Sequence, residues 1–234
     1  MQFADKTVLI TGASRGIGRA LVDEVLARGA RRVYAGTRGP LPHPDARVVP
    51  LPLDVTSEEQ IRAAAEHVGT LDVLVNNAGL ALYGDLAERS ALERQLAVNL
   101  YGLHDVTGAF VPHLVRSRGT LVNVLSLAAV AAVPVMPAYS VSKAAAFALS
   151  QSQRALLAGQ GVSVHAVLSG PVDTDMTRDL DIPKSTPESV ARGIADGVEK
   201  GEEEIFPDPL SETIAEGWQS GPAKALERQN AELL

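Results

Sequence analysis

The chain of 234 residues contains no cysteine. Disulfide bonds, thiolate zinc sites and thiol nucleophiles are therefore excluded. Histidine is also scarce, and no two histidines stand at metal-ligand spacing; the five are His43, His67, His104, His113 and His165. The sequence thus predicts no metal site.

Excess positive charge and long apolar runs are lacking too. A formal net charge of −7 and a pI near 5.3 argue against a nucleic-acid binder. The longest apolar candidate, residues 121–136, is interrupted by Asn123, Ser126 and Pro134, and it is too short to span a bilayer. The N-terminus leads straight into a strand-like run without the pattern of a secretion signal. We therefore expect no membrane partner and a cytoplasmic location.

Strand-like and helix-like segments alternate along almost the whole chain. Apolar, β-branched runs predict strands at residues 7–10, 31–36, 48–53, 71–75, 120–125, 162–168 and 203–206. Helical periodicity predicts helices at residues 17–28, 56–68, 90–98, 100–115, 137–158 and 188–199. Apolar strands that alternate with helices indicate an α/β fold, a Rossmann-like doubly wound parallel sheet of about seven strands with helices on both faces.

No linker, repeat or change of composition divides the chain. We expect one domain over residues 1–234, with a cofactor half at about 1–118 and a catalytic half at about 119–234. Three prolines in residues 39–44 predict coil between the second and third strands. The tail from residue 210 is compatible with helix or irregular structure.

Tyr139 and Lys143 lie four residues apart in a predicted helix, so they share one face. Tyrosine has a pKa of about 10, and a nearby ammonium group favours the phenolate. Such a pair can exchange a proton with a carbonyl or alcohol oxygen. On its own the spacing is equally that of two residues on a solvated helix face.

Glycines at positions 12, 16 and 18 mark the turn from the first strand to the first helix. Glycine permits a tight turn and close approach of a ligand, and the helix N-terminus suits a pyrophosphate. The spacing is G-x3-G-x-G, which differs from the usual dinucleotide motif. Four further polar residues follow predicted strands or begin a helix: Asn76 and Asn77, Asn99 as a possible N-cap, and Ser126.

Together these motifs resemble the short-chain dehydrogenase/reductase family, in its shorter, single-domain branch, over about residues 5–200. The markers are T-G-x-x-x-G-x-G at 11–18, N-N-A-G at 76–79, Asn99, Ser126 and Y-x-x-x-K at 139–143. The resemblance implies that Tyr139 is the acid/base, that Lys143 lowers its pKa and binds the nicotinamide ribose, and that Ser126 positions the substrate carbonyl. Asn99 would hold a water that links Lys143 to solvent.

The resemblance also implies the cofactor site. Its expected residues are Gly12, Ser14, Arg15, Gly16, Ile17, Gly18, Thr37, Arg38, Asp54, Val55, Asn77, Ala78, Gly79, Tyr139, Lys143, Pro171, Val172 and Thr174. Residues 35–38 include no acidic side chain at the end of the second strand, whereas Arg15 and Arg38 suit a 2′-phosphate. We therefore expect NADP(H) to be preferred, with NAD(H) possible.

One departure from the family pattern follows the sixth strand, where Ser169 stands in place of a common proline. The expected substrate residues are Leu80, Tyr83, Ser126, Met136, Tyr139 and Met176. Because most neighbours of these positions are apolar, we expect a mainly apolar ketone or aldehyde, or the matching secondary alcohol. The family resemblance implies a homodimer or homotetramer, assembled through the helices near 100–116 and 137–158.

Two other interpretations remain open. A member of the same family can act on imines or as an epimerase with the same catalytic residues. A protein that binds the dinucleotide without catalysis is a third reading, although it would have no need of Ser126, Tyr139 and Lys143 together.

Overall fold

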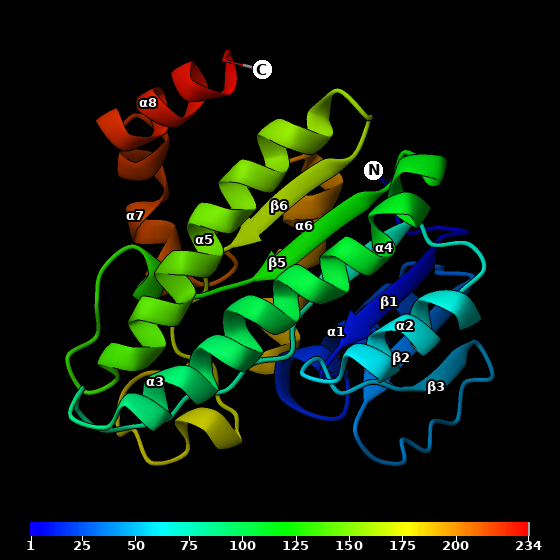
Figure 1. Ribbon diagram of the computed structural model, residues 1–234, viewed down its shortest axis with the longest axis horizontal. Coiled ribbons are helices and arrows are strands. Elements are labelled where there is room, and N and C mark those ends of the chain that lie inside the picture. The colour runs from blue at the N-terminus through cyan, green and yellow to red at the C-terminus, as the bar shows by residue number, and fades with distance from the viewer. Residues whose placement is uncertain (234) are drawn as a thin grey trace.

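The computed structural model describes residues 1–233, and its centre is a parallel sheet of seven strands in the order β3-β2-β1-β4-β5-β6-β7 (Figure 1). The strands are β1 (Thr7–Thr11), β2 (Arg32–Thr37), β3 (Val48–Pro52), β4 (Val73–Asn76), β5 (Thr120–Val124), β6 (Ser163–Val167) and β7 (Glu204–Ile205). This confirms the predicted fold class. The strand bounds differ from the predicted ones by one or two residues.

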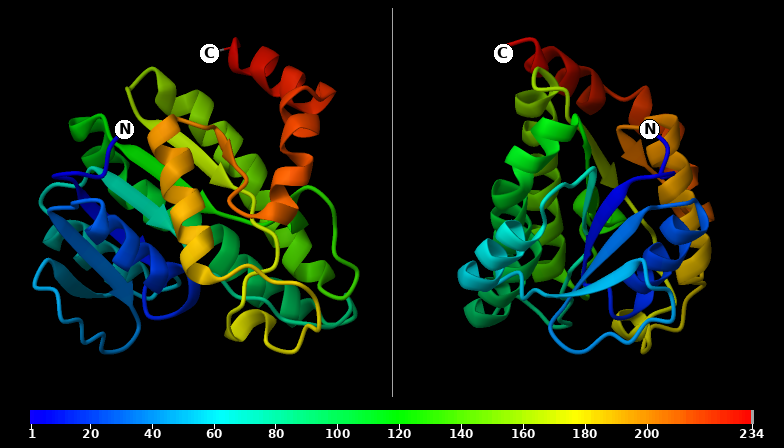
Figure 2. Two further views of the ribbon diagram at one scale, coloured as in Figure 1. Left: turned by 180° about the vertical axis from the view of Figure 1, so that it is seen from behind. Right: turned by 90° about the vertical axis from the view of Figure 1, so that its right-hand side faces the viewer.

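Helices cover both faces of the sheet, as Figure 2 shows edge-on. The α-helices that precede the tail are α1 (Gly16–Ala27), α2 (Glu58–His67), α3 (Arg89–Leu96), α4 (Leu103–Ser117), α5 (Pro137–Ala158) and α6 (Pro187–Lys200). One face packs on α1 and α6 through side chains such as Val22 and Ile194. The other packs on α2, α4 and α5 through side chains such as Ile61 and Phe110. Burial on both faces explains why the central strands are mostly apolar, although β4 and β5 each contain a buried asparagine, Asn76 and Asn123.

Local sequence signals account for several boundaries. The Ser57 hydroxyl accepts a hydrogen bond from the Gln60 backbone N–H at 3.3 Å, which confirms it as the N-cap of α2. Gly29, with a φ of +84°, follows the end of α1 in a left-handed conformation. Residues 38–47 form the predicted coil between β2 and β3.

The prediction that two separate helices meet at Asn99 is wrong. The two helices expected at 90–98 and 100–115 form one continuous helical segment, in which a π-helical turn (Ala97–Gly102) joins α3 to α4. Asn99 lies inside this turn and caps no helix. A π-helical turn inserts one extra residue into a helix and often accompanies a functional site. The hydrophobic periodicity of the sequence does not reveal such an insertion.

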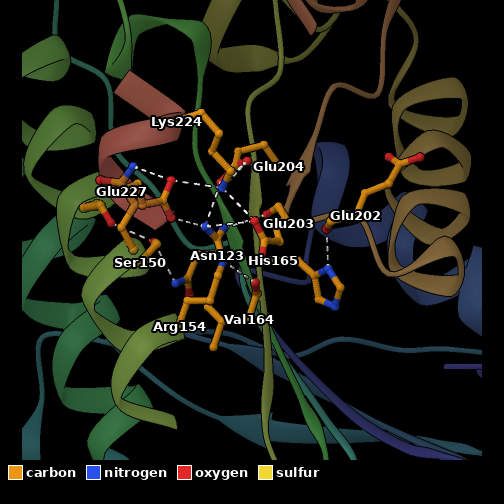
Figure 3. A network of polar contacts seen from close by, with 12 residues as sticks. Asn123, Ser150, Arg154, Val164, His165, Glu202, Glu203, Glu204, Lys224 and Glu227 are labelled. Atoms are coloured by element: carbon orange, nitrogen blue, oxygen red, sulfur yellow. Dashed lines mark hydrogen bonds and ion pairs between the residues drawn. The ribbon is translucent and has the colours of Figure 1, made fainter. Parts of the chain in front are cut away.

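The tail consists of two helices, α7 (Pro209–Gln219) and α8 (Pro222–Ala231). The Trp218 ring on α7 packs against Phe147 of α5, with ring centroids 5.3 Å apart. Figure 3 shows the buried ionic cluster that fastens α8 to the body. In it, the Lys224 ammonium lies 2.9 Å from Glu204 of β7 and 3.0 Å from Glu227. None of the described helices is long and apolar enough to cross a bilayer.

Candidate active site

The glycine turn after β1 is shaped by close backbone contacts. Gly12 and Gly16 adopt φ values of +65° and +55°, which side chains disfavour. A Cβ atom on Gly18 would lie only 2.3 Å from the Gly12 carbonyl oxygen and 2.4 Å from the Asn77 amide nitrogen. These positions therefore require glycine, and the predicted turn between β1 and α1 is confirmed.

Asn77 braces this turn from the neighbouring strand. Its side-chain amide donates hydrogen bonds to the carbonyl oxygens of Thr11 at 2.9 Å and Gly12 at 3.2 Å. The Thr11 hydroxyl in turn accepts hydrogen bonds from the backbone N–H groups of Asn77 and Ala78, both at 3.0 Å. The segment 76–79 therefore fixes the shape of the glycine turn.

A dinucleotide fits the groups around this turn. Within the described residues, no side chain caps the N-terminus of α1, and its first turn has no acidic residue, so its N–H groups remain available to an anion. Arg15, directly before α1, and Arg38, directly after β2, are both exposed. Arg15 forms an ion pair with Asp175 at 2.8 Å, which an incoming phosphate would have to replace.

The other expected cofactor residues lie on the loops at the same edge of the sheet. Asp54 accepts hydrogen bonds from the backbone and hydroxyl of Thr56, and these lower the pKa of its carboxyl group. Val55 packs against the π-helical turn at Gly102. The remaining expected residues lie in or near the segments that leave β1, β2 and β6: Ser14 in the glycine turn, Ile17 in the first turn of α1, Thr37 at the end of β2, and Pro171, Val172 and Thr174 in the loop after β6.

Asn99 uses its whole side-chain amide on protein groups. Its oxygen accepts a hydrogen bond from the Leu80 N–H at 2.8 Å, and its nitrogen donates to the Leu80 carbonyl at 2.8 Å and to the Ser142 hydroxyl at 2.9 Å. The Ser142 hydroxyl donates to the Tyr139 carbonyl at 2.7 Å. Asn99 thus joins the loop after β4 to the helix that carries Tyr139 and Lys143.

Tyr139 and Lys143 lie on the buried face of α5, as their spacing predicts. The Lys143 ammonium is 5.7 Å from the centroid of the Tyr139 ring and donates a hydrogen bond to the Val124 carbonyl at 2.9 Å. A Cβ atom on Gly79 would lie 3.8 Å from that ammonium, so the segment 76–79 borders the same site.

Burial dominates the protonation of this pair. It raises the pKa of Tyr139 to about 12, although a hydrogen bond with Ser126 acts in the opposite direction. It lowers the pKa of Lys143 to about 8. In the free protein burial therefore sets the direction of the Tyr139 shift, and the lowering of this pKa by Lys143 stays a prediction. At neutral pH the phenol holds its proton.

The expected substrate residues fall into two groups. Met136 packs with Tyr139 and Ala128 in a small apolar cluster beside the Ser126 turn. The second group joins two loops. The Tyr83 hydroxyl donates a hydrogen bond to the Met176 carbonyl at 3.1 Å, so the loops after β4 and β6 meet. Leu80 is half-buried and held by Asn99.

Three positioning contacts were not foreseen from the sequence. They involve Ser142 beside Asn99, Asp175 beside Arg15, and Gln95, whose buried carbonyl accepts a hydrogen bond from the Leu82 N–H at 3.1 Å. Gln95 and Asn99 stand four residues apart, so the polar spacing on one helix face was the available signal.

Comparison with known proteins places this geometry in a family. The family model described as short chain dehydrogenase matches residues 6–184. The chain therefore belongs to the short-chain dehydrogenase/reductase family, and the resemblance inferred from the motifs is confirmed.

Individual relatives extend this match. The chain is 34% identical over 233 residues to the ketoacyl reductase HetN of Nostoc sp., covering 89% of this chain and 81% of that protein. It is 34% identical over 200 residues to the 3-oxoacyl-[acyl-carrier-protein] reductase FabG of Thermotoga maritima, covering 77% and 79%. A crystal structure of a short chain dehydrogenase from Burkholderia cenocepacia in complex with NADP superposes with a TM-score of 0.90 at 35% identity, covering 98% of both chains. Together with the family match, these relatives show that the protein is an oxidoreductase of this family.

Proposed function

We propose that the protein is an NADP(H)-dependent carbonyl reductase that acts on mainly apolar ketones or aldehydes, or on the matching secondary alcohols. The observation that carries this proposal is the buried Tyr139, which packs beside the Ser126 turn with the Lys143 ammonium 5.7 Å from its ring, while the segment 76–79 connects this pair to the glycine turn. A phenol that keeps its proton at neutral pH suits donation to a carbonyl oxygen.

In the proposed reaction, the bound nicotinamide cofactor supplies or accepts the hydride. Ser126 positions the carbonyl oxygen by a hydrogen bond, and Tyr139 donates its proton to that oxygen. Lys143, whose pKa is lowered to about 8, is suited to return a proton to Tyr139 near neutral pH. Because the Asn99 side chain is fully engaged, a water in this relay would have to meet a backbone group of the π-helical turn.

Two observations support NADP(H) over NAD(H). Thr37, at the end of β2, donates its hydroxyl hydrogen bond to the Gly39 carbonyl at 2.6 Å, and residues 35–38 offer no carboxylate to a ribose hydroxyl. Arg15 and Arg38 provide the positive charge that a 2′-phosphate needs. The NADP-bound relative from Burkholderia cenocepacia agrees with this choice.

The test is cofactor oxidation with NADPH and then NADH against aromatic, aliphatic and cyclic ketones, aldehydes and imines. Tyr139→Phe should reduce ketone turnover by roughly a hundredfold or more at saturating NADPH. Turnover in Tyr139→Phe equal to that of the wild type would exclude this mechanism. Turnover only with imines, or isomerisation without net cofactor oxidation, would favour the alternative chemistries of the family. NADPH binding without any turnover would favour a sensor.

We further propose a homodimer or homotetramer that uses the outer faces of α4 and α5. Apolar or small side chains are exposed or half-buried there; they include Val111 and Val115 of α4, Tyr101 in the π-helical turn before it, and Val141, Ala144, Ala148 and Leu156 of α5. Small residues allow close helix packing across a two-fold axis. Light scattering on Leu156→Glu should show a smaller species than the wild type.

A further inference from the structure

The loop that follows β6 is held from three sides. The Ser169 carbonyl accepts a hydrogen bond from the Leu127 N–H at 2.9 Å, directly after Ser126. The Pro171 carbonyl accepts one from the Ser185 N–H at 3.0 Å. Between these two points, the Gly170 N–H donates to the Asp208 carboxylate at 2.8 Å. This loop leads to the residues expected to meet the nicotinamide.

Asp208 stands at the start of α7 and is 3% exposed. Its carboxylate also accepts hydrogen bonds from the Ser211 N–H at 3.0 Å and the Ser211 hydroxyl at 2.9 Å. Within the described residues it forms no ion pair, so backbone N–H groups and the N-terminus of α7 compensate its charge. One side chain therefore caps a helix and holds the loop.

The space around Gly170 is matched to this carboxylate. A Cβ atom on Gly170 would lie 2.7 Å from Asp208 Oδ1, closer than carbon and oxygen can approach without displacement. The ionic cluster of Figure 3 holds α8, the second helix after Asp208, against the sheet, because Lys224 of α8 contacts Glu204 at the start of β7. Asp208 lies beyond residues 6–184, the part that matches the family model.

We propose that Asp208 is a positioning residue for cofactor binding. It holds Gly170 in place and so sets the positions of Val172 and Thr174 against the nicotinamide end of the cofactor. The cofactor part of this inference rests on the proposed function. In this loop, the carboxylate of a tail helix provides the constraint that a proline at position 169 would otherwise supply.

Asp208→Ser is the informative variant. Serine is a good N-cap, so α7 keeps its cap, but a single short hydroxyl cannot also reach Gly170. The matched control is Ser117→Ala, which removes a hydrogen bond of 2.7 Å to the Leu71 carbonyl at the far end of the sheet. Both variants remove side-chain hydrogen bonds, and only the first loosens the loop.

The measurements are amide hydrogen exchange over residues 169–178 in the free protein and NADPH affinity by fluorescence titration. For Asp208→Ser we expect faster exchange in this segment and an NADPH Kd raised roughly threefold to tenfold, the range that one buried hydrogen bond supports. The KM for NADPH should rise more than the KM for the ketone. Ser117→Ala should change neither the exchange nor the Kd.

Unchanged exchange and unchanged NADPH affinity in folded Asp208→Ser would overturn the proposal. Should that variant fail to fold, Gly170→Ala carries the same test, because its methyl group displaces the carboxylate. In the double variant the effect of Gly170→Ala should shrink, since serine leaves room for the methyl group. A wild-type protein that does not bind NADPH would refute the proposed function, and the exchange measurement would still decide the role of Asp208.

Discussion

Replacing Lys143 by methionine should stabilise the protein at neutral pH while it abolishes turnover. The Lys143 side chain is 5% exposed, and burial lowers the pKa of its ammonium group to about 8. In the unfolded chain this pKa is about 10.4. The folded state therefore binds the proton more weakly than the unfolded state, and carrying the charge into the core costs stability at pH 7. Methionine has a similar length and no charge.

The magnitude follows from the two pKa values. Their difference corresponds to about 3 kcal/mol of unfolding free energy at pH 7. The lost hydrogen bond from the ammonium to the Val124 carbonyl offsets about 2 kcal/mol of this gain. Lys143→Met should thus be more stable than the wild type by about 1 kcal/mol at pH 7. Between pH 8 and pH 10.4 the unfolded state binds more protons, so the wild type regains about 3 kcal/mol and becomes the more stable protein.

The assay is urea unfolding of both proteins at pH 7, 8, 9 and 10. Taking the difference between them cancels the titration of all groups that they share. Lys200→Met, which removes a lysine with a 69% exposed side chain, should show a difference from wild type that is independent of pH. A similarly flat difference for Lys143→Met would refute the reasoning, because it would mean that burial does not weaken proton binding at Lys143.

Two further substitutions test packing at opposite ends of the molecule. Gly18→Ala should destabilise the fold by about 1 to 3 kcal/mol and weaken NADPH binding at least tenfold, because its Cβ atom meets the Gly12 carbonyl and the Asn77 amide. Thermal unfolding measures the loss of stability, and fluorescence titration measures NADPH binding. Lys224→Met should cost about 3 kcal/mol in urea unfolding, because it leaves the buried Glu204 without one of its cations.

Each of these has a matched control in the chain. Gly217→Ala places a methyl group where no atom lies within 4 Å, so it should leave NADPH binding unchanged. Lys200→Met removes a cation from an exposed pair and should change stability by less than about 1 kcal/mol. If Gly18→Ala bound NADPH as tightly as Gly217→Ala does, the glycine turn would not form the cofactor site. Equal stability of the two lysine variants would contradict the assigned role of the ionic cluster.

Much of the fold follows from patterns that act over short distances. Strand–helix alternation, the Ser57 cap and the three glycines each depend on neighbours within a few residues, and the structure confirms them. The positions of Ser126 and Tyr139 follow in the same way, because the carboxyl ends of parallel strands share one edge.

The remaining features depend on partners far apart in the sequence. Asp208 contacts Gly170 across 38 positions, and Asn99 contacts Ser142 across 43. No periodicity reports such pairs. The raised pKa of Tyr139 could not be predicted for a related reason: the spacing to Lys143 is visible in the sequence, whereas the depth of burial emerges only when the strands and helices pack around the phenol.

The buried amides between β4 and β5 have a consequence for how the sheet assembles. Asn76 and Asn123 are directly paired in register, and their side chains lie 3.0 Å apart in a hydrogen bond. Asn123 also donates to Ser150 and Gln153 of α5, at 2.9 Å and 3.0 Å. A shift of one residue between these strands would turn the amide of the shifted strand to the opposite face and break the hydrogen bond between the two amides. The apolar residues around them would tolerate such a slip far better, so these two asparagines select a single alignment of the strands during folding.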